Sequence, residues 1–211
     1  MRIAGFAAGP FQTNCYIVAN EQRAFVIDPG LGAHEPVAQM TQQEGLSVEA
    51  VVLTHGHIDH IRDAAAFGVE TFVHPADAFM LLRGEGVSEQ ARQLYDASGM
   101  QPIDNPTPLE DGQTFEVAGV ELNVVHAPGH SPGCVMLVAD EVVFSGDVLF
   151  RGSIGRTDLP DSNPEQMQQS LRGPVWDLAD ELQVLPGHGP ATTVAHERAT
   201  NPFLRQANAF R

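Results

Sequence analysis

The seven residues THGHIDH, 54–60, place three histidines and one aspartate directly after the strand-like run VEAVVL. A short run rich in apolar and β-branched residues predicts a buried β-strand. Side chains two residues apart in an extended chain point the same way, so His55 and His57 would face one space where the strand ends. Gly56 lets the backbone bend between them. The stretch therefore predicts a cluster of polar side chains held at the end of a strand.

Asp59 and His60 extend this cluster, because they begin a predicted helix and can point back toward the same space. Histidine and carboxylate groups are ligands for zinc, iron or manganese. One catalytic metal with an open position needs about three protein ligands. The loop offers four candidates, and this surplus indicates either a second metal or a carboxylate that orients the others.

Three more candidate ligands follow strand-like runs beside glycines: His130 in VVHAPGHSPG, Asp147 in VVFSGD and His188 in QVLPGHG. Small residues let the backbone approach a shared centre. Taken singly, His188 would be a hydrogen-bonded polar residue, Asp59 a helix N-cap and Asp147 a turn residue. Together they favour a metal centre. The remaining histidines lack this setting and are expected to be structural or solvated: His34, His74, His126 and His196.

Apolar runs predict strands in two groups, each followed by helices. The predicted strands cover residues 2–6, 15–20, 24–30, 48–53, 70–74, 114–119, 120–127, 134–140, 141–147 and 182–187, with a hairpin turn at Gly119. The predicted helices cover about 34–44, 59–67, 75–83, 88–98 and 164–172, with a short helix closing the chain. Hairpins disfavour a doubly wound parallel sheet. The pattern indicates an α/β sandwich of two packed sheets with helices outside, formed by a single domain over residues 1–211.

Composition excludes several classes of partner. The formal charge is −16 and the chain contains no lysine, so no surface is expected to neutralise many phosphates of a nucleic acid. No apolar run approaches the roughly 20 residues of a membrane span, and the N-terminus lacks the apolar core of a signal peptide. Cys15 and Cys134 lie far apart in strand-like runs. We expect a cytoplasmic protein with two buried thiols and no membrane association.

Several motifs resemble one known family. THGHIDH, with GH at 129–130, GD at 146–147 and GHG at 187–189, is similar to the signature of the metallo-β-lactamase superfamily over nearly the whole chain. The segments NCYIV, IDPG, PGHSPG, SGDVLF, GRTD and ERATNPF narrow the resemblance to the glyoxalase II-like (hydroxyacylglutathione hydrolase) branch. The resemblance implies a four-layer αββα sandwich.

The resemblance also implies a ligand set for two divalent metal ions, zinc in the first place with iron or manganese as alternatives. His55, His57 and His130 would hold one metal, and Asp147 would bridge to the other. The second metal would be held by Asp59, His60 and His188. Such a pair lowers the pKa of a shared water, so hydroxide can attack a thioester carbonyl near neutral pH. Asp59 would be catalytic, because it would also orient the nucleophile.

The resemblance indicates a small-molecule thioester such as S-D-lactoylglutathione as the substrate. Arg156, in GRTD, matches a basic residue that contacts substrate in the family. About twenty residues follow His188, which is too few for the C-terminal helical domain that binds glutathione in the longer enzymes. We therefore expect the short bacterial form, with the identity of the thiol carrier open.

Other functions fit the sequence less well. A persulfide dioxygenase on the same fold would use a single iron, held by His55, His130 and Asp147. A binding module without catalytic activity would have a damaged ligand set, whereas every family position is filled here. The detailed motifs disfavour lactam hydrolysis, and the charge disfavours RNA processing.

Overall fold

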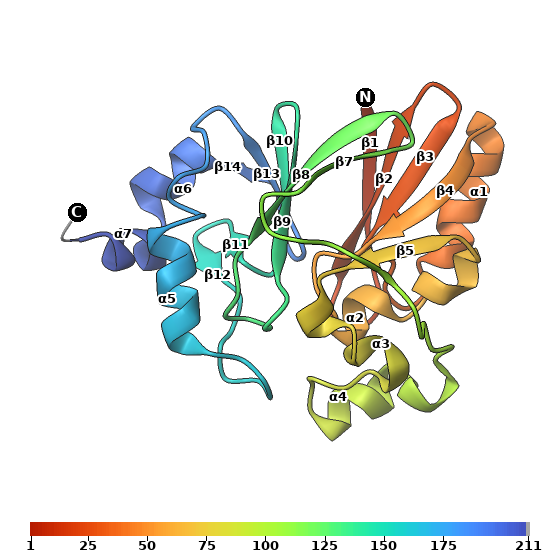
Figure 1. Cartoon of the computed structure of the whole chain (residues 1–211), viewed down its shortest axis with the longest axis horizontal. Helices are drawn as coiled ribbons and strands as arrows, with labels where there is room; N and C mark the ends of the chain where they lie inside the picture. Colours follow the sequence, from red (N-terminus) through yellow and green to blue (C-terminus); the bar gives the residue numbers. More distant parts are fainter. Residues whose placement is uncertain (210–211) are drawn as a thin grey trace.

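The computed structural model describes residues 1–209, and two large β-sheets occupy its centre (Figure 1). The first sheet follows the order of the chain: β1 (Arg2–Ala8), β2 (Thr13–Asn20), β3 (Arg23–Ile27), β4 (Ser47–Val52), β5 (Glu70–Val73) and β6 (Thr107–Pro108). The pairs β1–β2 and β2–β3 are antiparallel, and β3 to β6 run parallel. The antiparallel pairs confirm that the fold is not a doubly wound parallel sheet.

The second sheet has the order β14-β13-β10-β9-β8-β7. Its strands are β7 (Thr114–Val117), β8 (Val120–His126), β9 (Val135–Ala139), β10 (Val142–Gly146), β13 (Gln183–Pro186) and β14 (Thr192–Thr193). Only the pair β10–β13 is parallel among these described strands. The β7–β8 hairpin turns through Gly119, whose φ of +75° suits glycine, as the sequence predicts. Strands β11 (Leu149–Phe150) and β12 (Ser153–Ile154) form a separate small ribbon.

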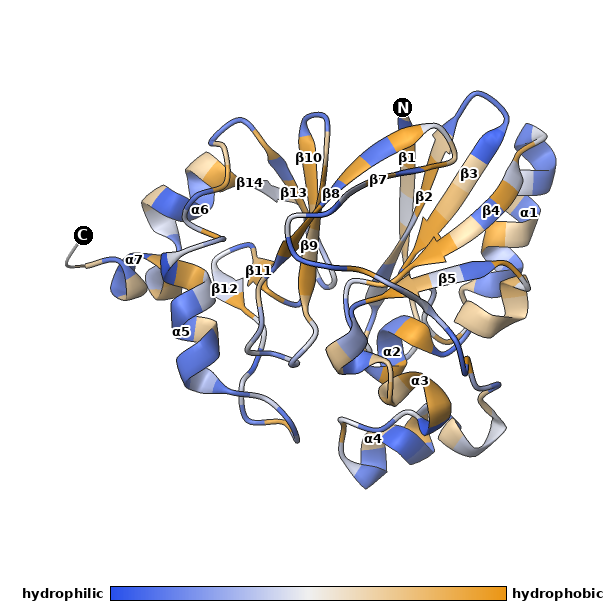
Figure 2. Cartoon of the chain, viewed as in Figure 1, coloured by the Kyte–Doolittle hydropathy of each residue, from blue (hydrophilic) through white to orange (hydrophobic). Residues whose placement is uncertain are grey.

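Alternate side chains of the central strands enter different cores. On β2, Val18 belongs to the core between the sheets, and Ile17 belongs to the core beneath helix α1 (His34–Glu44). On β10, Phe144 faces the first sheet, and Val143 packs with residues of helix α5 (Pro164–Arg172). These central strands are therefore largely apolar on both faces, and β10 appears mostly orange in Figure 2. Four layers of helix, sheet, sheet and helix confirm the predicted αββα sandwich.

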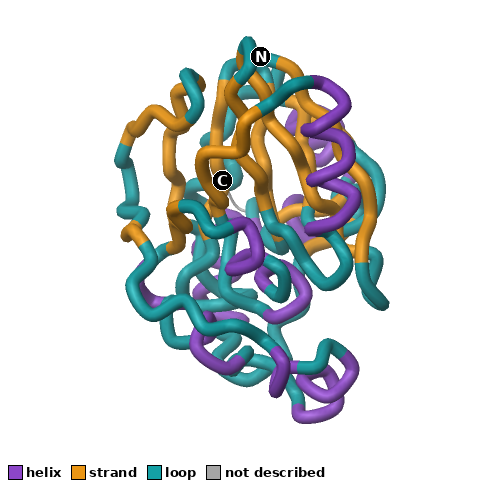
Figure 3. The backbone as a smooth tube through the Cα atoms, turned by 90° about the vertical axis from the view of Figure 1, so that its right-hand side faces the viewer, coloured by secondary structure: helices purple, strands orange, loops and turns teal. Residues whose placement is uncertain are grey.

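The remaining helices are short. The segment between β4 and β6 contains the α-helices α2 (Ile58–Ile61), α3 (Met80–Arg83) and α4 (Glu89–Leu94) and the 3₁₀ helices η1 (Ala64–Phe67), η2 (Pro75–Asp77) and η3 (Ala97–Gly99). Two helices close the described chain, α6 (Val194–Thr200) and α7 (Pro202–Ala207). In Figure 3 the strands gather in the upper half, and loops and short helices fill the lower half. No helix within residues 1–209 has both the length and the apolar character needed to cross a bilayer.

Three predicted helices are wrong in their extent. The helix predicted over 59–67 breaks at Asp63, whose carboxylate instead accepts hydrogen bonds from the backbone N–H groups of Gly32 and His34. The helix predicted over 88–98 ends at Leu94, because Asp96 adopts a left-handed φ of 48°. The helix predicted over 75–83 divides into η2 and α3. The two-residue strands β6, β11, β12 and β14 were not predicted, since two residues show no alternation.

Candidate metal centre

The loop after β4 brings its four candidate ligands into a buried space. His55, His57, Asp59 and His60 each have at most 7% of their surface exposed. Helix α2 begins directly after His57, so its first turn carries the next two ligands back beneath the strand end. The rings of His55 and His60 lie 4.1 Å apart between centroids. The short turn thus gathers side chains that an extended chain would spread apart.

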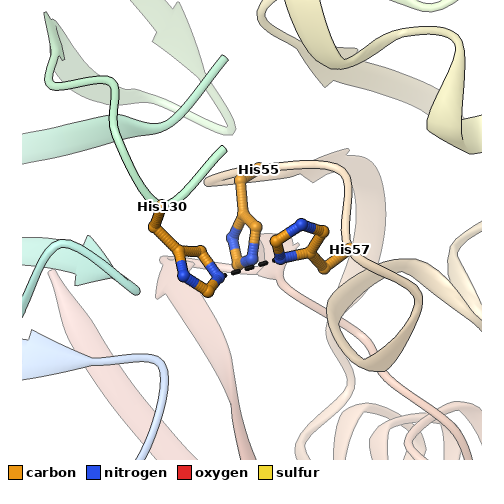
Figure 4. Close-up of side chains that lie close together, drawn as sticks. All are labelled: His55, His57 and His130. Carbon is orange, nitrogen blue, oxygen red and sulfur yellow. Dashed lines mark hydrogen bonds between the residues drawn. The ribbon is translucent and has the colours of Figure 1, made fainter. Parts of the chain in front are cut away.

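A first group combines His55 and His57 with His130 from the loop between β8 and β9 (Figure 4). One ligand atom of each lies within 4.8 Å of those of the other two. His57 Nδ1 and His130 Nε2 are 2.8 Å apart. All three side chains are buried. This spacing suits three nitrogen ligands that converge on one cation.

A second group combines Asp59 and His60 with His188, which follows β13. Asp59 Oδ2 lies 3.5 Å from His60 Nε2 and 3.3 Å from His188 Nε2. Thr13 Oγ1 donates a hydrogen bond to the same carboxylate at 2.9 Å. Two nitrogens and one oxygen therefore meet in a second potential cation site.

Asp147, at the end of β10, lies between the two groups. Its Oδ2 is 3.3 Å from His130 Nε2 in the first group and 3.4 Å from His188 Nε2 in the second. Its Oδ1 is 3.4 Å from His60 Nε2. One carboxylate thus faces histidines of both groups, which is the placement that a shared ligand requires.

Hydrogen bonds fix which ring nitrogens face the centre. His60 Nδ1 donates to Asp28 Oδ2 at 2.9 Å. Thr54 Oγ1 donates to the same oxygen at 2.6 Å, and so it accepts from His55 Nδ1 at 3.1 Å. Both imidazoles are therefore held with Nε2 toward the centre. Asp28 acts as an orienting carboxylate of the kind that supports metal-ligating histidines.

Hydrogen bonds at Nδ1 also orient His130 and His188. His130 Nδ1 faces the backbone carbonyl of Arg156 at 2.8 Å, and His188 Nδ1 faces that of Phe11 at 3.1 Å. A carbonyl only accepts, so both Nδ1 atoms donate, and Nε2 is the ring nitrogen of each that faces the centre. Among the candidate histidines, only His57 presents Nδ1 to its group.

Several of these inward atoms have no hydrogen-bond partner within the described residues. They are buried, and they include His55 Nε2, His60 Nε2 and Asp147 Oδ1. An unpartnered buried polar atom costs about 1–3 kcal/mol. A cation at the centre would satisfy these atoms, and the set of imidazoles and carboxylates suits zinc, iron or manganese. The residues therefore fit a metal pair.

The candidate histidines differ in the direction in which their pKa values are shifted. Burial lowers the pKa of His57 to about 3 and holds the pKa of His55 well below its usual range. Burial also acts to lower the pKa of His188, but hydrogen bonds to Asp147 and Asp59 outweigh it and raise that pKa to about 9. His55 and His57 are thus ready as neutral ligands, whereas His188 must release a proton when a metal binds.

Residues outside the predicted set hold the ligand loops in place. Asp77, buried in η2, accepts hydrogen bonds from the backbone N–H of Gly56 at 2.9 Å and of Gly133 at 2.6 Å. Its Oδ2 also accepts from Ser131 Oγ at 2.5 Å. One carboxylate therefore ties the His57 loop to the His130 loop. Asp28 belongs to the segment IDPG, which marks the family resemblance, whereas no sequence signal pointed to Asp77.

Close packing around Gly187 explains why a glycine precedes His188. A Cβ there would collide with Asp147 Oδ1 and come within 2.7 Å of His60 Cε1. The segment after β13 can therefore approach the centre only without a side chain.

A cavity of about 430 Å³ opens above the centre. His57, Asp59, His130, Asp147 and His188 reach its lining. Arg156 also lines it, but its guanidinium pairs with Asp158 at 2.6 and 2.8 Å and its side chain is 63% exposed. A substrate could therefore reach the candidate ligands from this cavity, past Arg156.

The histidines and cysteines that were not predicted to be metal ligands lie outside the centre. His34 packs edge-on against Phe67, and His74 stacks on His126 with ring centroids 4.1 Å apart. His196 is exposed. Cys15 and Cys134 are buried free thiols, as predicted, and burial raises the pKa of both well above its usual value.

Comparison with known proteins agrees with this geometry. Residues 8–188 match the family model described as the Metallo-beta-lactamase superfamily. The chain belongs to the metallo-beta-lactamase superfamily. Members of this superfamily are mostly metal-dependent hydrolases.

Curated superfamily relatives match over nearly their whole length. An uncharacterized protein of Mycobacterium tuberculosis is 38% identical, with 97% of this chain and 98% of the relative covered. Hydroxyacylglutathione hydrolase GloC of Haemophilus influenzae is 36% identical, with 92% of this chain and 93% of the relative covered.

Solved structures of the superfamily show the same fold. The structure described as TTHA1623 in a di-iron-bound form has a TM-score of 0.81 and 37% identity, covering 95% of this chain and 99% of that one. BLEG-1 B3 metallo-beta-lactamase also has a TM-score of 0.81, with 32% identity over 96% of this chain and 99% of that one.

Proposed function

We propose that this protein is a binuclear metal-dependent thioester hydrolase of the glyoxalase II type. Its substrate would be S-D-lactoylglutathione or a similar ester of a low-molecular-weight thiol. The observation that carries the proposal is Asp147, which faces histidines of two separate ligand groups. The 36% identity to hydroxyacylglutathione hydrolase GloC supports the thioesterase class.

The proposed ligands are the seven side chains named from the sequence: His55, His57, Asp59, His60, His130, Asp147 and His188. When bound, two divalent ions supply hydroxide near neutral pH and polarise the carbonyl to be attacked. The seven side chains would hold the ions. Asp28 fixes the orientation of the His60 imidazole. Most of the ligands are buried at the base of the cavity.

Asp59 is the proposed catalytic residue. It lines the cavity and accepts a hydrogen bond from Thr13, which fixes its carboxylate beside the space for substrate. There it can orient the attacking water. A thiol leaving group has a pKa of about 8.5, so it can depart as thiolate without a strong general acid. Arg156 is the proposed contact for the substrate at the cavity wall.

The test is hydrolysis of S-D-lactoylglutathione by purified protein, with and without a chelator. We expect turnover that the chelator abolishes and that added zinc, iron or manganese restores. Absence of metal-dependent turnover would reject this substrate.

Metal stoichiometry tests the binuclear centre. We expect about two metals per chain and no oxygen uptake with a persulfide substrate. One iron per chain together with oxygen consumption would instead identify the persulfide dioxygenase.

A further inference from the structure

The walls of the cavity above the candidate centre are mostly apolar. Two sides of the fold supply them, the N-terminal turn with the region of α4, and the ribbon formed by β11 and β12 with the loop that follows it. The apolar lining residues are Phe11, Val87, Ala91, Phe150, Ile154 and Leu159. The uncharged side chains Ser88 and Ser153 also line the cavity.

Arg156 is the only cationic side chain among the described lining residues apart from the candidate histidines. Both Nε and a terminal nitrogen of its guanidinium already bind the carboxylate of Asp158. The charge of Arg156 is therefore already balanced by a carboxylate, and a substrate anion would have to compete with Asp158 for it. No lysine exists elsewhere in the chain to replace it, and the formal charge of −16 disfavours the approach of anions.

We infer that the thiol portion of the substrate is a neutral, largely apolar group rather than a carboxylate-bearing peptide such as glutathione. The inference rests on the proposed thioester hydrolysis at the same centre. Glutathione carries two carboxylates and one ammonium. Its carboxylates would lose water beside apolar walls without gaining a free cation, which is unfavourable. A neutral carrier loses little on transfer and buries apolar surface there.

Matched substrates test this inference. The esters S-D-lactoylglutathione and S-D-lactoyl-N-acetylcysteamine share the acyl group and the scissile thioester, and only the glutathione ester carries carboxylates. We expect kcat/KM to be at least tenfold higher for the N-acetylcysteamine ester. Added salt should raise kcat/KM for the glutathione ester alone, because screening weakens the repulsion. Equal or higher kcat/KM for the glutathione ester would overturn the inference and leave the proposed function standing.

Binding provides a readout that does not depend on turnover. Calorimetric titration would compare S-hexylglutathione with S-hexyl-N-acetylcysteamine, two thioethers that cannot be hydrolysed. Tighter binding of the neutral thioether by at least tenfold supports the inference. Tighter binding of the glutathione thioether, or no binding of either, overturns it. If neither ester is cleaved by metal-loaded protein, the proposed function fails and this titration still decides the character of the cavity.

A substitution tests the part assigned to Asp158. Asp158→Asn should free Arg156 and raise kcat/KM for the glutathione ester about three- to tenfold, with the neutral ester changed by less than about twofold. The control is Glu49→Gln, which frees the exposed Arg23 from its 2.8 Å ion pair and changes the net charge equally. If the control raises kcat/KM for the glutathione ester as much as Asp158→Asn does, the local role of the Arg156 pair is wrong.

Discussion

Asp147 and His188 show how single residues set the chemistry of the centre. The Asp147 carboxylate lies within 3.4 Å of ring nitrogens from both ligand groups, and it is nearly fully buried. His188 is held between this carboxylate and Asp59. A buried carboxylate without partners would be unfavourable, so Asp147 depends on the histidines around it.

Asp147→Ala should remove the shared ligand. We expect bound metal to fall from about two to at most one per chain and activity to fall about 100-fold or more, because two cations would lose the carboxylate between them. Elemental analysis and the thioester assay measure both effects. Asp104→Ala, at an exposed position outside the centre, is the control. Unchanged metal content and activity in Asp147→Ala would show that the carboxylate is not shared.

The partly buried side chain of His74, outside the metal centre, should make the stability of the fold depend on pH. Burial and the adjacent His126 lower the pKa of His74 to about 4, below its unfolded value of about 6.5. Between these values the unfolded chain binds more protons, so stability falls as pH drops from about 6.5 to 4. In the folded chain, neutral His74 Nδ1 accepts from the backbone N–H of Ala76 and caps η2.

His74→Asn keeps a capping side chain and removes the titration. In metal-free protein, urea unfolding should show wild-type stability falling by about 1 kcal/mol more than that of the variant between pH 7 and pH 4.5, after allowance for partial exposure. Identical slopes for the two proteins would rule out a contribution from His74.

At the scale of elements, the ligand loops are positioned by strands and joined by η2. Strand β4 delivers the first loop, β8 and β9 flank the second, and Asp77 of η2 bonds to both. The helix predicted over 75–83 is interrupted at this place. The local sequence pattern predicts a continuous α-helix here. The break coincides with the hydrogen bonds of Asp77 to distant residues, which a local pattern does not contain.

Asp77→Asn should loosen both loops, because an amide nitrogen would then face a donor. We expect metal affinity to fall about 10- to 100-fold and the free energy of unfolding to fall by about 2–3 kcal/mol. Chelator competition and urea unfolding measure these changes. Ser131→Ala, which removes only one of the three bonds, should cost about 1 kcal/mol. Wild-type metal affinity in Asp77→Asn would show that η2 does not position the ligands.

At the scale of the whole molecule, the centre lies where the two halves of the sandwich meet. The first half supplies the ligands that follow β4, and the second half supplies His130, Asp147 and His188. A bound metal pair would therefore join the halves. We propose that residues 1–211 act as one domain for this reason.

Removing the metal should lower the thermal midpoint. At a free metal concentration about 1,000 times the dissociation constant, binding adds about 4 kcal/mol. For a chain of this size, that corresponds to about 8–16 °C in Tm. Differential scanning calorimetry with and without chelator measures the shift. A Tm that the chelator leaves unchanged would show that bound metal does not stabilise the fold.

The sequence by itself determined the sheet strands, the αββα class and the chemical identity of the candidate ligands. Apolar runs such as VEAVVL define strands locally, and THGHIDH places its ligands through spacing alone. The long strands were therefore predicted, whereas helix lengths were wrong where Asp63 and Asp96 make side-chain contacts with distant residues.

Only the tertiary structure decided that Asp28 and Asp77 support the ligands, and that Arg156 is already paired with Asp158. The contacts of Asp28 and Asp77 join residues far apart along the chain, and the pairing of Arg156 depends on a side-chain conformation. Local periodicity reports which way a side chain leaves its own strand or helix. Which distant partner it meets depends on how the two sheets pack, because only that packing brings their loops together around one buried space.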